Sequence, residues 1–325
     1  MNEDSEILLP VVVATIVVIL FCVVMLIKGT GPEIYKVSVI VSDSNSGRWV
    51  PFKAGLEQAA NDNNIELNYV HTEYLDNIYT EAEIINEEIS RGADGIIAEF
   101  CLSDGVDDLV ASIGARVPIQ FVVTDVIADA DVSGNHATVA PDNYAIGRAV
   151  GNELVIDYGE KLSDIKIGII SGNQNQLGMQ QRLEGFIDST KKMKPDIVWT
   201  VAETRYTREE LDKAFANEPA DIVIGLDNNS LETAVDRLSG ENDGNVKFYG
   251  SGCSEKLVYY IDSGKIDSMI LPNEFSMGYQ SMSDLAIKLQ NRTSQLVSKE
   301  IDYNVVHREN LFGEDNEQIL FPIVK

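Results

Sequence analysis

Polar residues follow most of the short apolar segments of this chain, and these residues could carry its chemistry. They lie at positions 42–49, 99–101, 125, 171–173, 227–229 and 250–252. Their carboxylate, amide, hydroxyl and guanidinium groups donate or accept hydrogen bonds in defined directions. Loops of this composition, gathered at one place, can hold a small polar molecule.

The chain lacks the sequence motifs of several common enzyme classes. It has no phosphate-binding P-loop and no G-x-S-x-G nucleophile motif. Its three histidines and three cysteines are far apart and do not have the spacing of metal ligands. We therefore expect no cofactor and no metal, and no enzymatic activity. Paired carboxylates near a cleft could act on glycosides, so a glycoside-active enzyme stays as a less favoured alternative.

The charge of the chain argues against nucleic acid as a partner. The 325 residues include 52 acidic and 25 basic side chains, which gives a net charge of −27. Binding to phosphates requires clusters of Lys and Arg. The acidic balance instead predicts a well-solvated surface.

The N-terminal residues predict a membrane anchor. Residues 7–27 are an uninterrupted apolar run, long enough for a helix that spans the hydrocarbon core of a bilayer. The preceding residues are acidic, and no small-x-small cleavage pattern closes the run, which disfavours a secretory signal peptide. Cys22 follows Leu20 and Phe21 and so lacks the small residues expected before a lipid-acceptor cysteine. The prediction is one uncleaved transmembrane helix.

The charges beside the anchor do not decide its orientation. Lys28 is the only basic residue close to the span, and on the positive-inside rule it favours a cytoplasmic location for the domain that follows. The side of the membrane on which this domain lies must therefore be inferred from the kind of domain it is.

Short apolar runs alternate with amphipathic stretches after the anchor. The expected strands are residues 36–42, 65–70, 95–98, 119–124, 137–139, 166–171, 197–202, 221–225, 246–250 and 268–271. The expected helices are residues 50–63, 79–91, 106–114, 143–158, 178–191, 207–216, 230–238 and 256–263. Strands that alternate with helices predict parallel sheets covered on both faces. Two series of about five strands each predict an α/β protein with two doubly wound parallel-sheet lobes, whose ligand lies beyond the carboxyl ends of the strands.

Several segments resemble the type I periplasmic sugar-binding proteins and the effector domains of LacI-type repressors. They are KVSVIVSDSNSGRW with PFKAGLEQAAND, TVAPDNYAIGRAVGNEL, KIGIISGNQNQLGMQQRLEGF, IVIGLDNNSLETA and MILPNEFSMGYQSM. The likeness extends from about Tyr35 to the C-terminus. It implies two lobes joined by a multi-strand hinge that closes on a ligand, usually a sugar.

The resemblance also implies domain boundaries. Residues 1–31 are the anchor, residues 34–140 with about 274–303 form the N-terminal lobe, and residues 141–273 with about 304–325 form the C-terminal lobe. The chain differs from the family pattern at residues 250–253, where an Asp is common, and at Pro272, where a Gln is common. Two polar contacts that family members typically make with ordinary monosaccharides are therefore not expected here.

The residues that the resemblance implies as ligand contacts are Asn45, Arg48, Trp49, Glu99, Asp125, Asp142, Arg182, Asp227 and Asn273. Charged and amide side chains suit sugar hydroxyls, and an aromatic ring such as that of Trp49 suits the apolar face of a sugar. Structural roles stay open for several of them. Asp142 and Asp227 could cap helices, Trp49 could pack between the lobes, and Glu99 could pair with an arginine.

The implied function is a membrane-anchored, extracytoplasmic receptor for a sugar-like molecule. Its partner is then a transporter permease of the ABC type or, as the alternative, a sensor kinase or other signalling protein. A LacI-type regulator is excluded because the chain has an apolar span where a helix-turn-helix would be needed.

Overall fold

The computed structural model describes residues 13–23, 33–127, 135–240 and 246–321, and residues 13–23 form a helix. The predicted membrane span, residues 7–27, extends beyond the described residues at both of its ends. None of the helices in the described ranges is both long and apolar enough to cross a bilayer. Contacts divide the chain into residues 1–34 and residues 35–325, and the following paragraphs concern the second unit.

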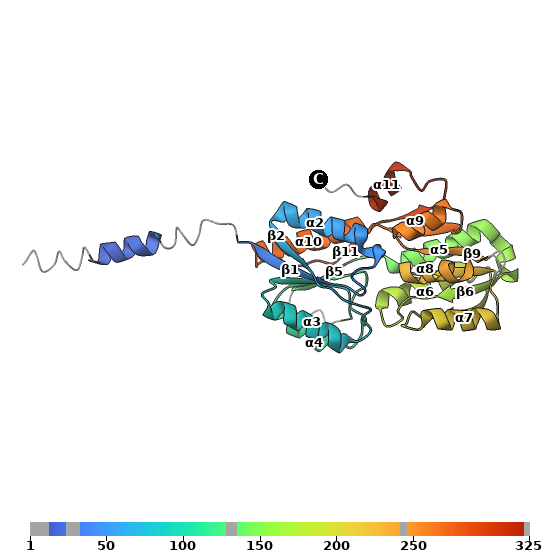
Figure 1. Ribbon diagram of the computed structural model, residues 1–325, viewed down its shortest axis with the longest axis horizontal. Coiled ribbons are helices and arrows are strands. Elements are labelled where there is room, and N and C mark those ends of the chain that lie inside the picture. Colours follow the sequence, from blue (N-terminus) through green and yellow to red (C-terminus); the bar gives the residue numbers. More distant parts are fainter. Residues whose placement is uncertain (1–12, 24–32, 128–134, 241–245, 322–325) are drawn as a thin grey trace, which may run out of the picture. The chain divides into compact units, whose positions relative to one another are not determined.

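The first lobe is built on a six-stranded sheet with the strand order β11-β5-β4-β3-β1-β2. Its strands are β1 (Tyr35–Ile40), β2 (Ile65–Tyr69), β3 (Gly95–Ala98), β4 (Ile119–Val122), β5 (His136–Pro141) and β11 (Lys299–Ile301). All of its strand pairs are parallel. Its helices are η1 (Gly47–Trp49), α2 (Val50–Asn63), α3 (Ile78–Ser90), α4 (Asp107–Gly114) and α10 (Glu274–Gln290). Figure 1 shows α2 and α10 on one face of this sheet and α3 and α4 on the other.

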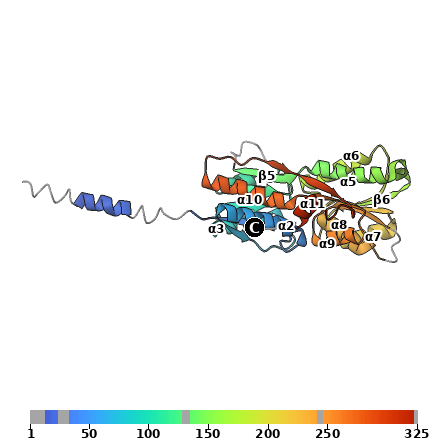
Figure 2. The same ribbon diagram turned by 90° about the horizontal axis from the view of Figure 1, so that it is seen from above.

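The second lobe repeats this arrangement with the strand order β12-β10-β9-β8-β6-β7. Its strands are β6 (Lys166–Ile170), β7 (Asp196–Val201), β8 (Ile222–Gly225), β9 (Lys247–Ser251), β10 (Ser268–Pro272) and β12 (Tyr303–Val306). Its helices are α5 (Asn143–Tyr158), η2 (Gly159–Asp164), α6 (Leu177–Thr190), α7 (Thr207–Asn217), α8 (Asn228–Leu238) and α9 (Glu255–Asp262), and α11 (Glu314–Leu320) follows β12. Figure 2 shows α5 and α6 on one side of the sheet and α7, α8 and α9 on the other.

The sequence explains why both sheets are buried. Strands β3, β4 and β8 are fully buried tetrapeptides (GIIA, IQFV and IVIG), as expected of parallel strands with helices on both faces. Each sheet separates two hydrophobic clusters, one under each helical layer. The carboxyl ends of the strands, where the chain must turn into polar loops, are therefore the places left for a ligand.

The chain passes between the lobes at three points. Strand β5 ends at Pro141 and leads into α5, β10 ends at Pro272 and leads into α10, and β11 is separated from β12 by Asp302 alone. The second and third crossings are joined, because the amide of Asn273 donates a hydrogen bond to the carbonyl of Asp302 at 3.0 Å. The three crossings form the hinge.

The strands and helices predicted after the anchor are all present, with bounds that differ by one or two residues at most. The expectation of about five strands in each sheet was wrong, because β11 and β12 add a sixth strand to each. The second sheet is also not entirely parallel, since β12 pairs with β10 in the antiparallel direction. Helices α10 and α11 were not predicted.

Candidate functional site

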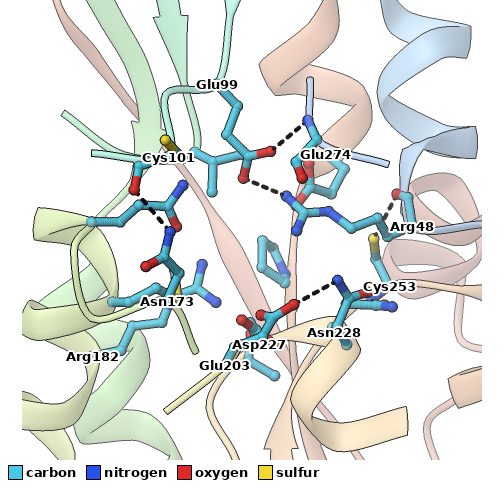
Figure 3. Close-up of a pocket in the computed structure, with 18 of the residues that line it drawn as sticks. Arg48, Glu99, Cys101, Asn173, Arg182, Glu203, Asp227, Asn228, Cys253 and Glu274 are labelled. Atoms are coloured by element: carbon cyan, nitrogen blue, oxygen red, sulfur yellow. Dashed lines mark hydrogen bonds and ion pairs between the residues drawn. The ribbon is translucent and has the colours of Figure 1, made fainter. Parts of the chain in front are cut away.

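The carboxyl ends of strands from both lobes enclose a small polar cavity of about 50 Å³ (Figure 3). Its walls come from the loops after β1, β2, β3 and β4, the loops after β6, β7, β8 and β9, the start of α6 and the hinge between β10 and α10. The lining residues are Ser42, Arg48, Tyr74, Leu75, Glu99, Cys101, Val123, Asn173, Gln176, Met179, Arg182, Glu203, Asp227, Asn228, Asn229, Ser251, Gly252, Cys253, Pro272 and Glu274.

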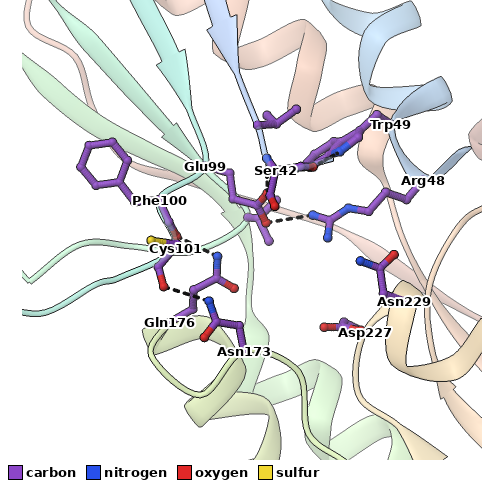
Figure 4. A network of polar contacts seen from close by, with 12 residues as sticks. Ser42, Arg48, Trp49, Glu99, Phe100, Cys101, Asn173, Gln176, Asp227 and Asn229 are labelled. Carbon is purple, nitrogen blue, oxygen red and sulfur yellow. Dashed lines mark hydrogen bonds and ion pairs between the residues drawn. The ribbon is translucent and has the colours of Figure 1, made fainter. Parts of the chain in front are cut away.

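Arg48 is the central cation of the first lobe's wall. Its Nη2 donates to Glu99 Oε1 at 3.0 Å, and the two side chains are 14% and 5% exposed. The guanidinium carbon lies 4.0 Å from the centroid of the Trp49 ring. Burial acts to lower the pKa of Arg48, but Glu99 and then Glu274 raise it above its usual value. Arg48 is therefore a permanent cation with its plane fixed by stacking and by an ion pair (Figure 4).

Arg182 is the cation of the second lobe's wall, and α6 supplies it. Its Nε donates to Asn143 Oδ1 at 2.8 Å, and its Nη1 donates to the carbonyl of Leu226 at 2.9 Å. Burial lowers the pKa of Arg182 to about 10. Asn143 also donates from Nδ2 to the carbonyl of Val123 in the first lobe at 3.0 Å. Arg182 is thus held rigidly by neutral groups at the place where the lobes meet.

Two carboxyl groups of the second lobe, those of Glu203 and Asp227, line the cavity together. Burial, and then the charge of Asp227, raise the pKa of Glu203 well above its usual value. Asp227 also caps α8, because its Oδ1 accepts from the amide of Ser230 at 2.7 Å. Asn229 Nδ2 donates to Glu203 Oε1 at 3.1 Å. Arg48 acts in the opposite direction and lowers the pKa of Glu203.

Glu274 is the fourth carboxyl group of the cavity. Its Oε2 atom is buried and has no hydrogen-bond partner within the described chain. Burial raises the pKa of Glu274 to about 7, although Arg48 and Arg182 act to lower it.

Amide side chains of the second lobe reach across the cavity to the first lobe (Figure 4). Asn173 Nδ2 donates to the carbonyl of Cys101 at 2.8 Å, and Gln176 Nε2 donates to the carbonyl of Phe100 at 2.8 Å. Cys253, also of the second lobe, donates from Sγ to the carbonyl of Arg48 in the first lobe at 3.3 Å. The lobes are thus in direct polar contact around the cavity.

An ion pair joins the lobes at the surface. Arg205, after β7, donates from Nη2 to Asp76 Oδ1 at 3.0 Å and from Nε to Asp76 Oδ2, and it also reaches the carbonyl of Tyr74 at 3.3 Å. Arg205 and Asp76 are 56% and 45% exposed, so the pair is accessible to salt.

We expect Arg205→Ala to weaken ligand binding by about two- to fivefold, because an exposed pair stabilises a closed arrangement only slightly. The loss should disappear in 1 M salt, where the charges are screened. Calorimetric titration at two salt concentrations measures it. Arg237→Ala is the matched control, because Arg237 pairs with Asp212 within the second lobe at similar exposure. Equal effects of the two variants would contradict the prediction.

Glu81 lies behind the cavity wall and is 1% exposed. Its two carboxyl oxygens accept from the amide of Cys101 at 3.1 and 3.2 Å. Burial raises the pKa of Glu81 to about 8, against the effect of the Cys101 amide. The folded protein therefore holds this proton between pH 4.5 and 8, while the unfolded chain loses it at its ordinary pKa of about 4.3.

The contribution of Glu81 to the free energy of unfolding is fully present at low pH. It is lost as the pH rises from the unfolded pKa towards 8, because in that interval Glu81 ionises readily only in the unfolded chain. We expect Glu81→Gln to become more stable relative to the parent by about 3 kcal/mol between pH 5.5 and pH 8.5. Urea unfolding at both pH values measures this difference. If the variant and the parent differed in free energy of unfolding by the same amount at both pH values, Glu81 would be ionised in the folded protein.

Of the residues predicted from the sequence to touch the ligand, Arg48, Glu99, Arg182 and Asp227 line the cavity. The other five lie elsewhere. Trp49 is completely buried in the first lobe's core, where its Nε1 donates to the carbonyl of Ser42 at 3.0 Å. Arg48 lies over its ring, which is the place that the prediction gave to a sugar.

Asn45, Asp125, Asp142 and Asn273 also lie outside the cavity lining, each with a local partner. Asn45 is exposed and contacts His71 at 3.3 Å. Asp125 accepts from the amide of Val126 at 2.9 Å and from the hydroxyl of Thr138. Asp142 and Asn273 cap α5 and α10, accepting from the amides of Ala145 at 2.8 Å and Ser276 at 2.9 Å.

The predicted ligand contacts did not include Asn173, Gln176, Glu203 or Glu274. Asn173 was among the polar strand ends noted in the sequence, and the same rule could have found Gln176 and Glu203, which follow strands β6 and β7. Glu274 opens a helix that was not predicted. No group of three or more potential metal-binding side chains occurs within the described ranges.

Comparisons with known proteins agree with this architecture. Solved structures similar to this chain include a glucose-galactose binding protein, GanP, from Geobacillus stearothermophilus (20% identity, 86% of this chain and 100% of that one, TM-score 0.73). Another is a carbohydrate transporter solute-binding protein from Agrobacterium radiobacter in complex with D-arabinose (17% identity, 89% and 100%, TM-score 0.77). A third is a XylFII–LytSN complex (20% identity, 86% and 99%, TM-score 0.71).

No curated protein sequence gives a significant match. The structures above establish the two-lobed α/β fold. The periplasmic binding protein domain matches residues 37–293, which is most of the chain. The chain therefore belongs to the periplasmic binding protein family, as its resemblance to the type I members predicted.

Proposed function

We propose that this protein is an extracytoplasmic solute-binding protein that closes on a small, polar, sugar-like ligand and delivers it to an ABC-type permease. The observation that carries the proposal is the cavity between the two lobes, where two arginines and four carboxyl groups converge from the carboxyl ends of both sheets. We assign Arg48, Glu99, Arg182 and Asp227 as ligand contacts. Side chains of this kind match the directed donors and acceptors of a polyhydroxylated molecule.

The mechanism that we propose is hinge closure. The three crossings can bend while each sheet stays rigid, and the ligand stabilises the arrangement in which both walls contact it. Asn173, Gln176 and Cys253, all of the second lobe, would form their contacts with backbone carbonyls of the first lobe as the cleft closes. Only the closed form then presents the combined surface that a partner recognises.

We also propose that residues 7–27 tether the protein to the membrane, with the lobes outside the cytoplasm. The length and composition of this apolar run support the tether. A protease-protection assay on intact cells tests the placement. Digestion of the lobes is expected, and their full protection would overturn it.

A ligand-sensing role beside a signalling partner is the second candidate. It is favoured by the similarity of this chain to a XylFII–LytSN complex, in which such a protein is assembled with a second one. Cross-linking in intact membranes, with and without ligand, distinguishes the two roles by the identity of the captured protein. A permease is expected under the first proposal, and a membrane kinase under the second.

A thermal-shift screen of the full chain in mild detergent tests ligand binding itself. The panel contains pentoses, hexoses, amino sugars, nucleosides and polyols. A ligand that binds only the folded state raises the melting temperature in proportion to the logarithm of its concentration above Kd. At least one sugar-like compound is expected to give such a shift. If none does, the proposed function is wrong.

A further inference from the structure

The charges that line the cavity are unequal. Two guanidinium groups face four carboxyl groups, those of Glu99, Glu203, Asp227 and Glu274. Arg48 is already paired with Glu99, and Arg182 donates hydrogen bonds to neutral oxygens, those of Asn143 and Leu226. When all four carboxyl groups are ionised, the lining carries two negative charges in excess of its positive ones. Buried charge of this kind requires a counter-charge or a bound proton.

Two polar atoms of the lining have no partner within the described chain. One is Glu274 Oε2, and the other is the hydroxyl of Ser251, whose residue is completely buried. Buried polar groups in native proteins are almost always hydrogen-bonded, and an unpartnered one in a cavity wall indicates a group that the ligand supplies. Of these two atoms, Glu274 Oε2 is an acceptor that is negatively charged when the carboxyl group is ionised, so it suits a donor that carries positive charge.

Glu203 and Asp227 add a second acceptor for positive charge. Both carboxyl groups line the cavity from the second lobe, and burial, and then the charge of Asp227, act to raise the pKa of Glu203. A cation beside them offsets the repulsion between the two carboxylates. An uncharged hydroxyl cannot do so, because it brings no counter-charge.

We propose that the ligand of this cavity is a cationic polyol, that is a sugar-like molecule with a protonated amine, bound through its ammonium group by Glu274, Glu203 and Asp227. An ammonium group has three donors and no acceptor, so carboxylates are the acceptors that suit it. Charge-assisted hydrogen bonds of this type are shorter and stronger than neutral ones. The inference rests on the proposed function, because it specifies the class of sugar-like ligand that the same cavity takes.

Calorimetric titration of the full chain in mild detergent tests it with matched probes. For glucose, galactose and mannose, the neutral sugar, its 2-amino form and its N-acetylated 2-amino form are compared at pH 6.5. The amino form of at least one sugar is expected to bind ten or more times as tightly as both of its uncharged relatives. If the uncharged forms bind equally well or better, the inference is overturned while the proposed function stands. If none of the probes binds, and no compound of the thermal-shift panel does either, both fail together.

Charge-neutralising variants test the assignment of the carboxylates. Glu274→Gln and Glu203→Gln keep the shape and most hydrogen-bonding capacity of the side chains but remove their negative charge. Each is expected to reduce the preference for the amino form at least tenfold, with a smaller effect on the neutral sugar. Glu210→Gln, which removes an exposed carboxylate from the second lobe, where Glu203 also lies, is the control and should leave the preference unchanged. An unchanged preference in both cavity variants would overturn the assignment, whereas equal losses for both sugars would indicate a structural role.

Discussion

Replacing Arg48 with alanine is expected to reduce ligand affinity at least a hundredfold and to lower the free energy of unfolding by about 3–5 kcal/mol. The loss of stability follows from Glu99, which is 5% exposed and whose only ion pair is the one with Arg48 in the described structure. Removing the guanidinium leaves this carboxylate buried without a counter-charge, and it also removes the group that covers the Trp49 ring. Urea unfolding measures the stability, and calorimetric titration with a ligand from the thermal-shift screen measures the affinity.

A double variant separates the two effects. Arg48→Met with Glu99→Gln removes both charges, keeps an apolar stem against Trp49 and keeps an oxygen that can accept from the amide of Ser42. Most of the lost stability should return, because a buried ion pair can be exchanged for neutral groups at little net cost. The affinity should stay low, since the donor for the ligand is absent. Recovery of binding in the double variant would show that Arg48 supports the fold and does not contact the ligand.

The fold and part of the site could be predicted because both follow from strand periodicity. Buried β-branched runs located the strands, and polar residues after those runs located Glu99 and Asp227. Asp227 was considered as either a helix cap or a ligand contact, and the structure places it both at the N-terminus of α8 and in the cavity wall. Asp142 was considered in the same way, and only its capping bond is present.

The remaining errors concern side-chain direction and weakly patterned segments. Trp49 is next to Arg48 in a 3₁₀ turn, and consecutive residues there point in different directions, which no spacing rule resolves. Strands β11 and β12 are short, and their burial depends on which sheet each joins across the hinge. Glu274 belongs to the cavity only because α10 begins at the hinge, so its role required the tertiary structure.

Each lobe contains a pair of helices that contact each other through glycine. In the second lobe, a Cβ atom on Gly147 of α5 would lie 1.9 Å from the carbonyl oxygen of Arg182 in α6, and one on Gly185 would lie 2.2 Å from that of Tyr144. The first lobe has the same reciprocal arrangement between Gly55 of α2 and Gly278 of α10. Backbone atoms cannot move aside as flexible side chains do, so any larger residue must push the helices apart.

Gly147→Ala is expected to lower the free energy of unfolding by about 2–3 kcal/mol, even though alanine is intrinsically the better helix former by about 1 kcal/mol. The clash is with the backbone of Arg182, so separation of the helices also moves this guanidinium from its place in the cavity wall. Ligand affinity should therefore fall about tenfold or more, since a displacement of about 1 Å at a positioning group has effects of that size. Urea unfolding and calorimetric titration measure the two quantities on the same preparation.

Gly114→Ala is the matched control, because Gly114 also lies in a helix, α4, but a Cβ there would come no closer than 3.7 Å to another residue. This control should equal the parent protein in stability and affinity, or slightly exceed it in stability. If Gly147→Ala were as stable as the parent, the two helices could separate without loss of stability. The close packing of α5 on α6 would then not hold Arg182 in position. If stability fell while affinity did not, Arg182 would be held by Asn143 and the carbonyl of Leu226 rather than by the position of its own helix.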